Sequence, residues 1–519
     1  MAYYHGGRLQ LLNLALGLGT FIQILDSSIA NVAIPYIAGN LDVSTDEGTW
    51  VITAFAASNA IVLPLTGWLS DCFGRVRLFV WSVLLFVITS FFCGFSSSLT
   101  MLVTFRILQG AVAGSLIPLS QSLLMSSNPP EKRGSALGMW SMIVIVAPVV
   151  GPIIGGYLTE EYSWPWIFYI NVPIGLFSAA VTWYLLKDQD SAVVRNPIDW
   201  MGLCLLSIGV GSLQVMLDKG KDLDWFESNL ILALSAVSAV SLIYFGIWNY
   251  FQRYPIVDFS FFKLRNFAIG TAAITIGYLL YFTSTVCMPL WLQTEQGYTA
   301  YWAGVAVAPV GIVSICLSTF VGKHMGRFDL RMISALSFFF FSLSFFYQST
   351  FTTQVSLQQI MIARFYQGFG ITIFFLPIVQ IALSEVSTEK MASASGLFHF
   401  VRILIGSGFG TSLALELWSR LEIFHNARLT ESITAYNPVT TQFYKDLANV
   451  NPKFTYDVIN GVVAQQVEKQ AFMLAINDLT WIAGWLFLAM IPLIFLCKRV
   501  RSPASTSNEH SIKGEAFVA

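Results

Sequence analysis

Charged side chains are scarce in this sequence, at 11% of its 519 residues, whereas a soluble protein carries about 25%. Apolar residues make up 55% of the chain, and the mean hydropathy is +0.66. Most of the protein surface must therefore face lipid. The formal net charge of −1 gives no indication of a nucleic-acid partner, which a strongly basic protein would favour.

Cysteine is also scarce, and its spacing fits neither metal ligands nor a disulfide framework. The six cysteines are Cys72, Cys93, Cys204, Cys287, Cys316 and Cys497, and a free cysteine in an apolar run behaves as a small hydrophobic residue. The sequence has no Walker-type phosphate loop, no paired histidines with a metal-ligand partner and no nucleophile elbow. We therefore expect no enzyme, no metal and no cofactor, and we expect an ion gradient to supply the energy.

Long apolar runs recur fourteen times along the chain, each long enough to cross ~30 Å of hydrocarbon as a helix. The first run is too long for a signal peptide and contains Asp26, so we interpret it as a membrane span. The runs lie at residues 11–37, 49–69, 78–95, 100–124, 135–158, 166–186, 200–217, 230–251, 267–292, 302–321, 331–348, 358–383, 392–418 and 477–497.

The fold class that follows is an all-α membrane protein with fourteen transmembrane helices arranged 6+2+6. The two runs around 200–251 are the ones without a counterpart in the other half. We therefore expect four parts. They are an N-terminal six-helix bundle (1–186), two inserted transmembrane helices with flanking loops (187–266), a C-terminal six-helix bundle (267–497) and a polar tail (498–519).

Lysine and arginine gather on one side of the predicted membrane topology. The short loops on the other side hold only Lys219 and Lys221, so the positive-inside rule predicts cytoplasmic N- and C-termini. One outer connection, residues 419–476, is a polar segment too long for a turn. Its second part, 458–477, has apolar positions at helical spacing and should run as a helix into the last span. The tail after Arg501 is polar, and we expect it to be disordered.

Two near-identical cassettes, Arg106-Ile-Leu-Gln-Gly110 and Arg364-Phe-Tyr-Gln-Gly368, lie inside long apolar runs of the two halves. An arginine within hydrocarbon costs a few kcal/mol or more, so it normally faces a bundle interior or a watery cavity. Its occurrence at matching places in both halves indicates two homologous bundles around a polar pathway. That arrangement is typical of a secondary transporter.

Asp26 lies in the middle of the first predicted span, and the matching position of the other half is Leu280. Burial raises the pKa of a carboxyl group, while a nearby cation such as Arg106 lowers it. A carboxyl group balanced between these effects can exchange a proton when a cavity switches sides, so we expect Asp26 and Arg106 to couple transport to protons. A structural ion pair or a helix-to-helix hydrogen bond is the alternative.

Other polar side chains in apolar runs are candidates for the cavity wall. Arg364 could hold an anionic group or brace helices through carbonyl groups, and we favour bracing because its half has no evident carboxylate. His399 could titrate near neutral pH or serve as a hydrogen-bonded packing residue. The candidate cavity residues are Asn31, Gln109, Arg364, Gln367, His399 and Arg402.

A short basic loop, Gly67-Trp-Leu-Ser-Asp-Cys-Phe-Gly-Arg-Val-Arg77, joins the second and third predicted spans. Its glycines permit a tight turn, and its charged groups can form bonds to neighbouring helix ends that open and close. The candidate gating residues are Gly67, Asp71, Gly74 and Arg75. Topology-setting charge alone is the alternative. A weaker copy, 322–331, has Lys323 where Asp71 would fall.

The fifth predicted span contains Pro148, Gly151, Pro152, Gly155 and Gly156. Proline removes an internal hydrogen bond and kinks a helix, and glycines four residues apart allow helices to approach closely. We expect either a hinge between the two bundles or ordinary close packing.

Together these motifs resemble the major facilitator superfamily, and within it the fourteen-span drug:proton antiporters. The 67–77 loop resembles the signature loop between spans 2 and 3, and the first arginine cassette resembles the span 4 motif. Residues 151–156 are similar to the antiporter motif of span 5. Residues 25–35 are similar to a span 1 motif of the fourteen-span group, with Ser28 where threonine is commoner.

The resemblance implies proton-driven export of hydrophobic toxic compounds, by alternating access, across a bacterial inner membrane. It also implies a tripartite system, with a periplasmic membrane-fusion adaptor (EmrA-like) and a TolC-like outer-membrane channel. Three alternatives remain. They are export of a specific metabolite such as a fatty acid or a siderophore, import or facilitated passage of a defined solute, and a non-transporting receptor or scaffold.

Overall fold

The structure is a computed structural model of the chain and describes residues 6–129, 132–191, 193, 197–253, 255–434, 436–450 and 455–500. Regular structure in this part of the chain is helical, without a strand. Thirteen helices are long and apolar enough to cross a membrane, and one further helix pair, bent by 43°, makes up to fourteen. The predicted all-α membrane fold is confirmed. The predicted disordered tail after Arg501 lies outside the described residues.

The helices of the N-terminal half, several of them in two or three pieces, form six of these candidate spans. They are α1 (Gly7–Asn40), α3 (Trp50–Val62) with η1 (Leu63–Leu65) and α4 (Thr66–Phe73), α5 (Arg75–Gly94), α6 (Leu99–Ala113) with α7 (Leu116–Ser127), α8 (Arg133–Glu161), and α9 (Trp166–Tyr169) with α10 (Asn171–Leu186) and η3 (Lys187–Gln189). The short helix α2 (Thr45–Gly48) follows α1.

Two helices, α11 (Trp200–Lys219) and α12 (Asn229–Phe251), come next. The C-terminal half then contains α13 (Arg265–Thr294), α14 (Ala300–His324), α15 (Leu330–Gln348), α16 (Leu357–Leu383), α17 (Met391–Val401) continued by the π-helix η8 (Arg402–Phe409) and α18 (Gly410–Glu431), α19 (Pro438–Val450) and α20 (Tyr456–Phe495). Short helical turns in the connections are η4 (Trp225–Glu227), η5 (Phe259–Lys263), η6 (Met325–Arg327) and η7 (Thr388–Lys390).

The predicted kink in the fifth span is present in α8. The axes of Arg133–Pro148 and Val150–Glu161 differ by 43°. Proline at 148 and again at 152 leaves the preceding turn without two backbone hydrogen bonds, which is a common cause of a sharp helix bend.

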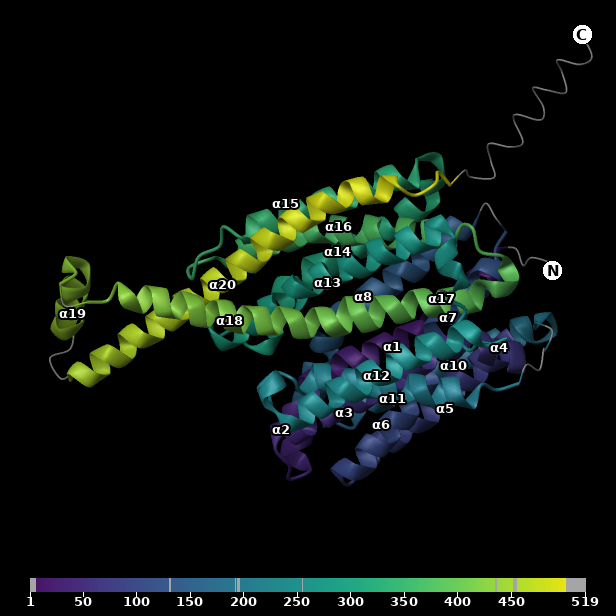
Figure 1. Ribbon diagram of the computed structural model, residues 1–519, viewed down its shortest axis with the longest axis horizontal. Helices are drawn as coiled ribbons and strands as arrows, with labels where there is room; N and C mark the ends of the chain where they lie inside the picture. Colours follow the sequence, from purple (N-terminus) through teal and green to yellow (C-terminus); the bar gives the residue numbers. More distant parts are fainter. Residues whose placement is uncertain are drawn as a thin grey trace, which may run out of the picture.

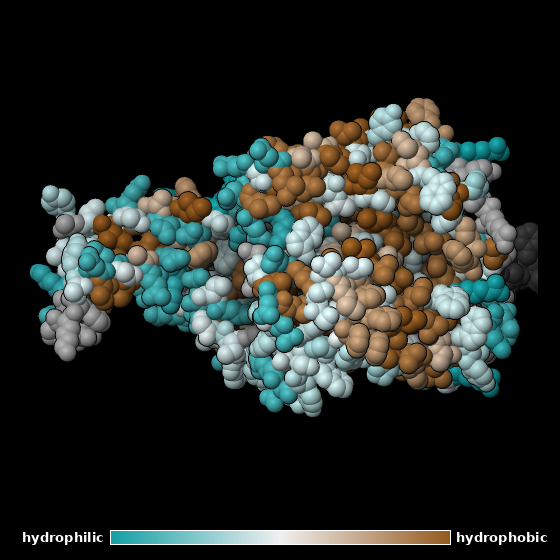
Figure 2. All heavy atoms as spheres, turned by 90° about the horizontal axis from the view of Figure 1, so that it is seen from below, coloured by the Kyte–Doolittle hydropathy of each residue, from teal (hydrophilic) through white to brown (hydrophobic). Residues whose placement is uncertain are grey.

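The spans lie side by side along the long axis of the molecule (Figure 1). We name the end that carries Arg75, Arg133 and Lys390 the basic end, and the opposite end, where α19 lies, the stalk end. A band of hydrophobic side chains covers the bundle between hydrophilic ends (Figure 2). This band is what a protein surrounded by lipid requires.

Two helices extend far beyond the bundle at the stalk end (Figure 1). Helix α18 continues to Glu431, and α20 already begins at Tyr456. The predicted helical run over 458–477 is therefore confirmed. Residues 419–431, for which we made no prediction beyond a polar segment too long for a turn, are helical as well.

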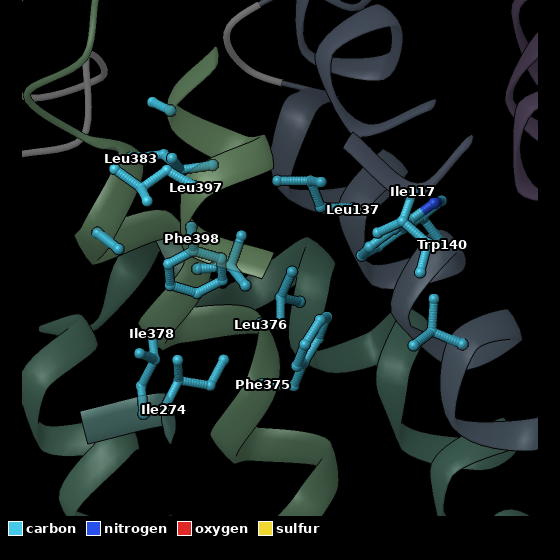
Figure 3. Packing of buried hydrophobic residues seen from close by; sticks show 14 of the residues in the cluster. Ile117, Leu137, Trp140, Ile274, Phe375, Leu376, Ile378, Leu383, Leu397 and Phe398 are labelled. Atoms are coloured by element: carbon cyan, nitrogen blue, oxygen red, sulfur yellow. The ribbon is translucent and has the colours of Figure 1, made fainter. Parts of the chain in front are cut away.

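The two halves share one hydrophobic core. Ile117 and Trp140 of the N-terminal half lie on one side of it, and Phe375 and Phe398 of the C-terminal half lie on the other (Figure 3). Inside a membrane, close packing of such side chains stabilises the contact between helices, because lipid tails are as apolar as the side chains themselves.

The inserted helix α11 contacts both halves at its stalk end. Lys219 donates to the hydroxyl group of Thr49 in the N-terminal half at 2.5 Å. Ser412 of the C-terminal half donates to the carbonyl oxygen of Leu217 at 2.8 Å. The following turn adds a bond from the indole nitrogen of Trp225 to Glu416, at 2.7 Å. The four-part division of the chain stays a prediction.

Candidate functional site

Asp26 of α1 is buried inside the N-terminal half, with 2% of its surface exposed. Arg106 of α6 donates from Nη1 to its Oδ2 at 2.5 Å. Asn171 of α10 donates to Oδ1 at 2.9 Å, and Gln109 donates to the same oxygen at 3.2 Å. Three donors around one carboxylate suit its ionised form, which only accepts hydrogen bonds.

The guanidinium group of Arg106 is fixed from several directions. Its Nε donates to the carbonyl oxygen of Val51 in α3 at 2.9 Å, and its Nη1 also donates to Gln109 at 2.7 Å. The group lies 4.2 Å from the ring centre of Phe55 and 5.6 Å from that of Phe168. Ring faces attract a cation, and more strongly where water is excluded.

Ser90 of α5 completes this network. Its hydroxyl oxygen accepts from Gln109 at 2.6 Å and from Asn171 at 3.2 Å. The structure thus brings Asp26 and Arg106 together, as expected, and also seals them from solvent. A change in the protonation of Asp26 therefore requires the surrounding helices to move.

Replacing Asn171 with leucine should lower the free energy of unfolding by about 1.5–3 kcal/mol, because a hydrogen bond to a buried charged group is lost. Thermal unfolding in detergent measures the change. Asn31→Leu is the control, since Asn31 is exposed on α1. Equal stability of the Asn171 variant and the wild type would contradict the assigned contact.

The second cassette forms a similar network, in which no acidic side chain of the described residues takes part. In α16, Arg364 donates to the side chain of Gln367 at 2.5 Å and to the backbone carbonyl of Ser284 at 2.8 Å. No ion pair of Arg364 is present among the described residues. A neutral carbonyl group of α13 thus takes the place that the carboxylate of α1 has in the other half, which agrees with the bracing role.

The glycines of both cassettes allow close helix contacts. A Cβ atom at Gly110 would collide with the backbone of Phe55, and one at Gly368 would lie 2.8 Å from Cβ of Val313. The cassettes therefore combine a buried cation with a close approach of two helices.

A third polar group lies where the two halves meet. Gln121 of α7 accepts hydrogen bonds from the hydroxyl group of Ser395 and, at 3.0 Å, from Nε2 of His399, both in α17. Arg402 donates from Nε to Nδ1 of His399 at 3.2 Å. Nδ1 accepts and Nε2 donates, so this arrangement fits the neutral imidazole ring.

The predicted gating loop crosses from one half to the other at the basic end. Arg75 donates from Nη2 to the carbonyl oxygen of Glu389 at 2.5 Å. Asp71 interacts electrostatically with Arg75 and with Lys390 of the other half. Gly67 lies directly against Ser393 of α17, where a Cβ atom would come within 2.5 Å of the serine Cβ.

Gly74 makes the turn of this loop. Its φ of 84° is in the region that favours glycine. The turn lets Asp190 accept from the backbone nitrogen of Val76 at 2.9 Å and pair with Arg77 at 3.6 Å. The first residues of α5 thereby gain acceptors for their free N–H groups.

The weaker loop copy, 322–331, makes its ion pairs inside its own half. Asp329 accepts from Nη2 of Arg331 at 2.8 Å and pairs with Arg499 at 3.4 Å. The hydrogen bond from the Arg331 side chain holds the pKa of Asp329 below its usual value. These contacts fix the basic ends of α15 and α20.

The motif of the fifth span packs against α1 of its own half. Gly151 lies against Ser28, whose hydroxyl group donates to the carbonyl of Pro148 at 3.1 Å, and Gly155 lies against Ile29. Pro152 is in the same helical segment, and Gly156 has open space around it. The hinge hypothesis stays a prediction.

Helix α8 contacts α14 of the other half on both sides of its bend. Nearer the stalk end, a Cβ atom at Gly304 of α14 would lie 3.5 Å from Cγ1 of Ile153. Two further contacts lie nearer the basic end. A Cβ atom at Gly138 would come within 3.0 Å of the Cα of Gly322 in α14, and one at Gly134 within 2.7 Å of the Gly322 carbonyl oxygen. Sequence reasoning missed these glycines. Their spacing of four residues was the available signal.

The structure divides the candidate cavity residues among three places. Gln109 belongs to the Asp26 network, and Gln367 belongs to the Arg364 network. His399 and Arg402 lie where the halves meet, and Asn31 is exposed on α1. Sequence reasoning missed the contacts of Ser90, Gln121, Asn171 and Ser395, although polar side chains inside apolar runs were a signal for each.

Comparisons with known proteins agree with this architecture. Residues 16–411 match the family model described as Major Facilitator Superfamily. The chain is 46% identical to the "Multidrug export protein EmrB" of Escherichia coli (strain K12) over 494 residues, which cover 95% of this chain and 96% of the relative. It is 44% identical to the "Fatty acid resistance protein FarB" of Neisseria gonorrhoeae over 495 residues, covering 95% and 97%.

A solved structure shares the fold at low sequence identity. The crystal structure of the human organic anion transporter MFSD10 (TETRAN) superposes with a TM-score of 0.55 and 12% identity, covering 93% of this chain and all of that one. The matched family model extends over most of the chain, and close relatives cover nearly all of it. The protein is therefore a multi-pass membrane transporter of the EmrB-like group and belongs to the Major Facilitator Superfamily.

Proposed function

We propose that this protein exports hydrophobic toxic compounds across the bacterial inner membrane, driven by protons that enter in exchange. The ion pair of Asp26 and Arg106 carries this proposal, because an ionisable group inside a membrane helix marks an ion or substrate pathway by default. Arg364 has no such acidic partner among the described residues. The carboxylate of Asp26 then exchanges the proton, and Arg106 is its partner in the ion pair.

Alternating access is supported by where the two halves touch. Arg75 with Glu389, Gly67 with Ser393, and Gly138 with Gly322 all join the halves near the basic end. Breaking these contacts would open the basic end. The positive-inside rule assigns that end to the cytoplasm, together with both termini, so the conformation described is closed towards the cytoplasm.

The stalk end then faces the periplasm. Helices α18 and α20 extend out of the bundle there and carry α19 (Figure 1). Such a projection suits the docking of a periplasmic membrane-fusion adaptor (EmrA-like), which would lead to a TolC-like outer-membrane channel. A simple cap over the exit is the alternative.

Export of fatty acids is the second candidate function. The similarity to FarB covers the chain as fully as the similarity to EmrB, and the two identities differ little. A resistance panel of dyes and fatty acids in a strain that lacks the gene, with and without the adaptor, would separate these candidates.

Uptake into everted membrane vesicles tests the direction and the energy source. In vesicles with an acidic interior, we expect a neutral hydrophobic dye to accumulate several-fold above its level without the gradient. The reason is that proton exit drives dye entry in this orientation. A protonophore should abolish the accumulation, and vesicles without the protein are the control. Equal dye distribution with and without the gradient would contradict proton-driven export.

A further inference from the structure

Arg402 is a buried cation that forms no ion pair with the residues the structure describes. It is 5% exposed, and none of the ion pairs among the described residues involves it. Its Nε donates to the neutral ring of His399, and the guanidinium group lies 4.5 Å from the ring centre of Tyr278 and 5.4 Å from that of Phe375. Charged groups inside a membrane normally pair with one another or face a pathway.

The position of Arg402 is close to the middle of the membrane. It follows the eleven residues of α17, which begins at the basic end with Met391. At 1.5 Å of rise per residue, Arg402 lies roughly 17 Å from that end, about half of the ~30 Å hydrocarbon thickness. Substrate sites of secondary transporters lie near this depth, between the repeats.

Aromatic side chains from both halves surround this position. Trp140 of the N-terminal half lies 5.9 Å from Phe375 and 6.3 Å from His399, between ring centres. Figure 3 shows Trp140 and Phe375 facing each other across the boundary between the halves. Apolar and aromatic side chains around one charged group are the usual lining of a site for a small amphiphilic ligand, although here they pack against one another in the described conformation.

The helix itself is irregular at this point. Arg402 is the first residue of a π-helix that extends to Phe409. Such π-helical turns are rare and occur frequently at functional sites. The wider turn changes the direction of the side chains it carries, and here Arg402 points at Tyr278 and Phe375.

Arg106 and Arg364, which are also buried in the spans, have different partners. Arg106 is neutralised by Asp26. Arg364 donates to Gln367 and Ser284 of its own half. Arg402, in contrast, is connected to the N-terminal half by two consecutive hydrogen bonds. It donates to His399, and His399 donates to Gln121 of the N-terminal half.

We propose that Arg402 binds the anionic group of an amphiphilic substrate, an organic carboxylate whose apolar body packs against Trp140, Tyr278 and Phe375. The carboxylate replaces the neutral ring of His399 as the acceptor, and a guanidinium–carboxylate pair can form two parallel hydrogen bonds. When the halves separate at the basic end, the bonds of Gln121 to His399 and Ser395 break and Arg402 becomes accessible. This inference rests on the proposed export function and adds a substrate class to it.

Binding of a matched ligand pair tests the proposal. Naphthalene-2-carboxylate and its neutral amide, both radiolabelled, are titrated against the full-length protein in lipid nanodiscs. We expect the wild type to prefer the carboxylate, and Arg402→Gln to weaken carboxylate binding at least tenfold, or about 1.4 kcal/mol, with little effect on the amide. Arg402→Lys should retain part of the preference, since the charge remains but the two-bond geometry is lost.

Arg420→Gln is the matched control, because Arg420 is an exposed arginine of α18 whose side chain pairs with Glu416. It should change neither affinity. The inference is wrong if the wild type binds the carboxylate no better than the amide, or if Arg402→Gln keeps the preference for the carboxylate. It is also wrong if both Arg402 variants lose affinity for the two ligands equally. Gradient-driven dye uptake in everted vesicles is measured in parallel. Its absence from the wild type would contradict the proposed export function instead.

Discussion

Asp26→Asn should reduce gradient-driven uptake of the dye in everted vesicles to the level of vesicles without the protein. Asparagine keeps the shape of the side chain but cannot exchange a proton. The change also leaves Arg106 buried without its counter-charge, and breaking a buried pair in this way costs roughly 3–5 kcal/mol. Uptake and thermal unfolding are therefore measured on the same preparation.

A double variant separates the proton role from the structural role. Asp26→Asn combined with Arg106→Gln removes both charges, so much of the lost stability should return while proton-driven uptake stays absent. If the double variant folds and transports like the wild type, Asp26 is not the coupling group and the pair is only structural. Downhill exchange of the dye is expected to persist, since it needs no proton.

Gly67→Ala should produce the second large effect, a shift of the protein away from the conformation closed at the basic end. The new Cβ would lie 2.5 Å from Cβ and 2.7 Å from Cα of Ser393, closer than real side chains come. Overpacking of this kind costs about 1–3 kcal/mol, which corresponds to a population shift of roughly 5–150-fold. Transport should fall accordingly, with little change in the stability of each half.

The distance between two spin labels measures this shift. The labels are attached to Arg77→Cys and Arg327→Cys, one in each half at the basic end, in a variant without other cysteines. We expect a longer distance between the labels in Gly67→Ala. Both side chains are exposed. Gly246→Ala in α12 is the control, because no described atom lies within 4 Å of the added Cβ and Gly246 belongs to none of the candidate sites. An unchanged distance distribution in Gly67→Ala would show that the contact with Ser393 does not limit closure.

The sequence was sufficient to predict the pairing of Asp26 with Arg106. Each is a charged side chain inside an apolar run, and hydrocarbon leaves few ways to accommodate it other than an opposite charge. The kink of α8 was predictable for a similar reason, because proline at position 148 acts on its own helix. Local covalent chemistry and strong electrostatics can both be predicted without tertiary structure.

The neutral partners were not predictable in the same way. Asn171 and Gln121 are ordinary polar residues in apolar runs, and their hydrogen bonds to Asp26 and His399 depend on how helices distant in sequence pack. The same holds for Gly134 and Gly138. Glycines four residues apart also occur at Gly151 and Gly155, which pack against α1 instead of the other half. Spacing alone does not identify the partner helix.

The position of α11 limits how far the two halves can rotate away from each other. Near its stalk end, Lys219 donates to Thr49, the residue before α3, and Leu217 accepts from Ser412 of α18. A rotation that separates α3 from α18 must therefore break one of these two hydrogen bonds. The inserted helix α11 then moves together with the half to which it stays bonded. The inserted helix thus links the two halves at this end, and its two hydrogen bonds limit how far α3 and α18 can separate while both are kept.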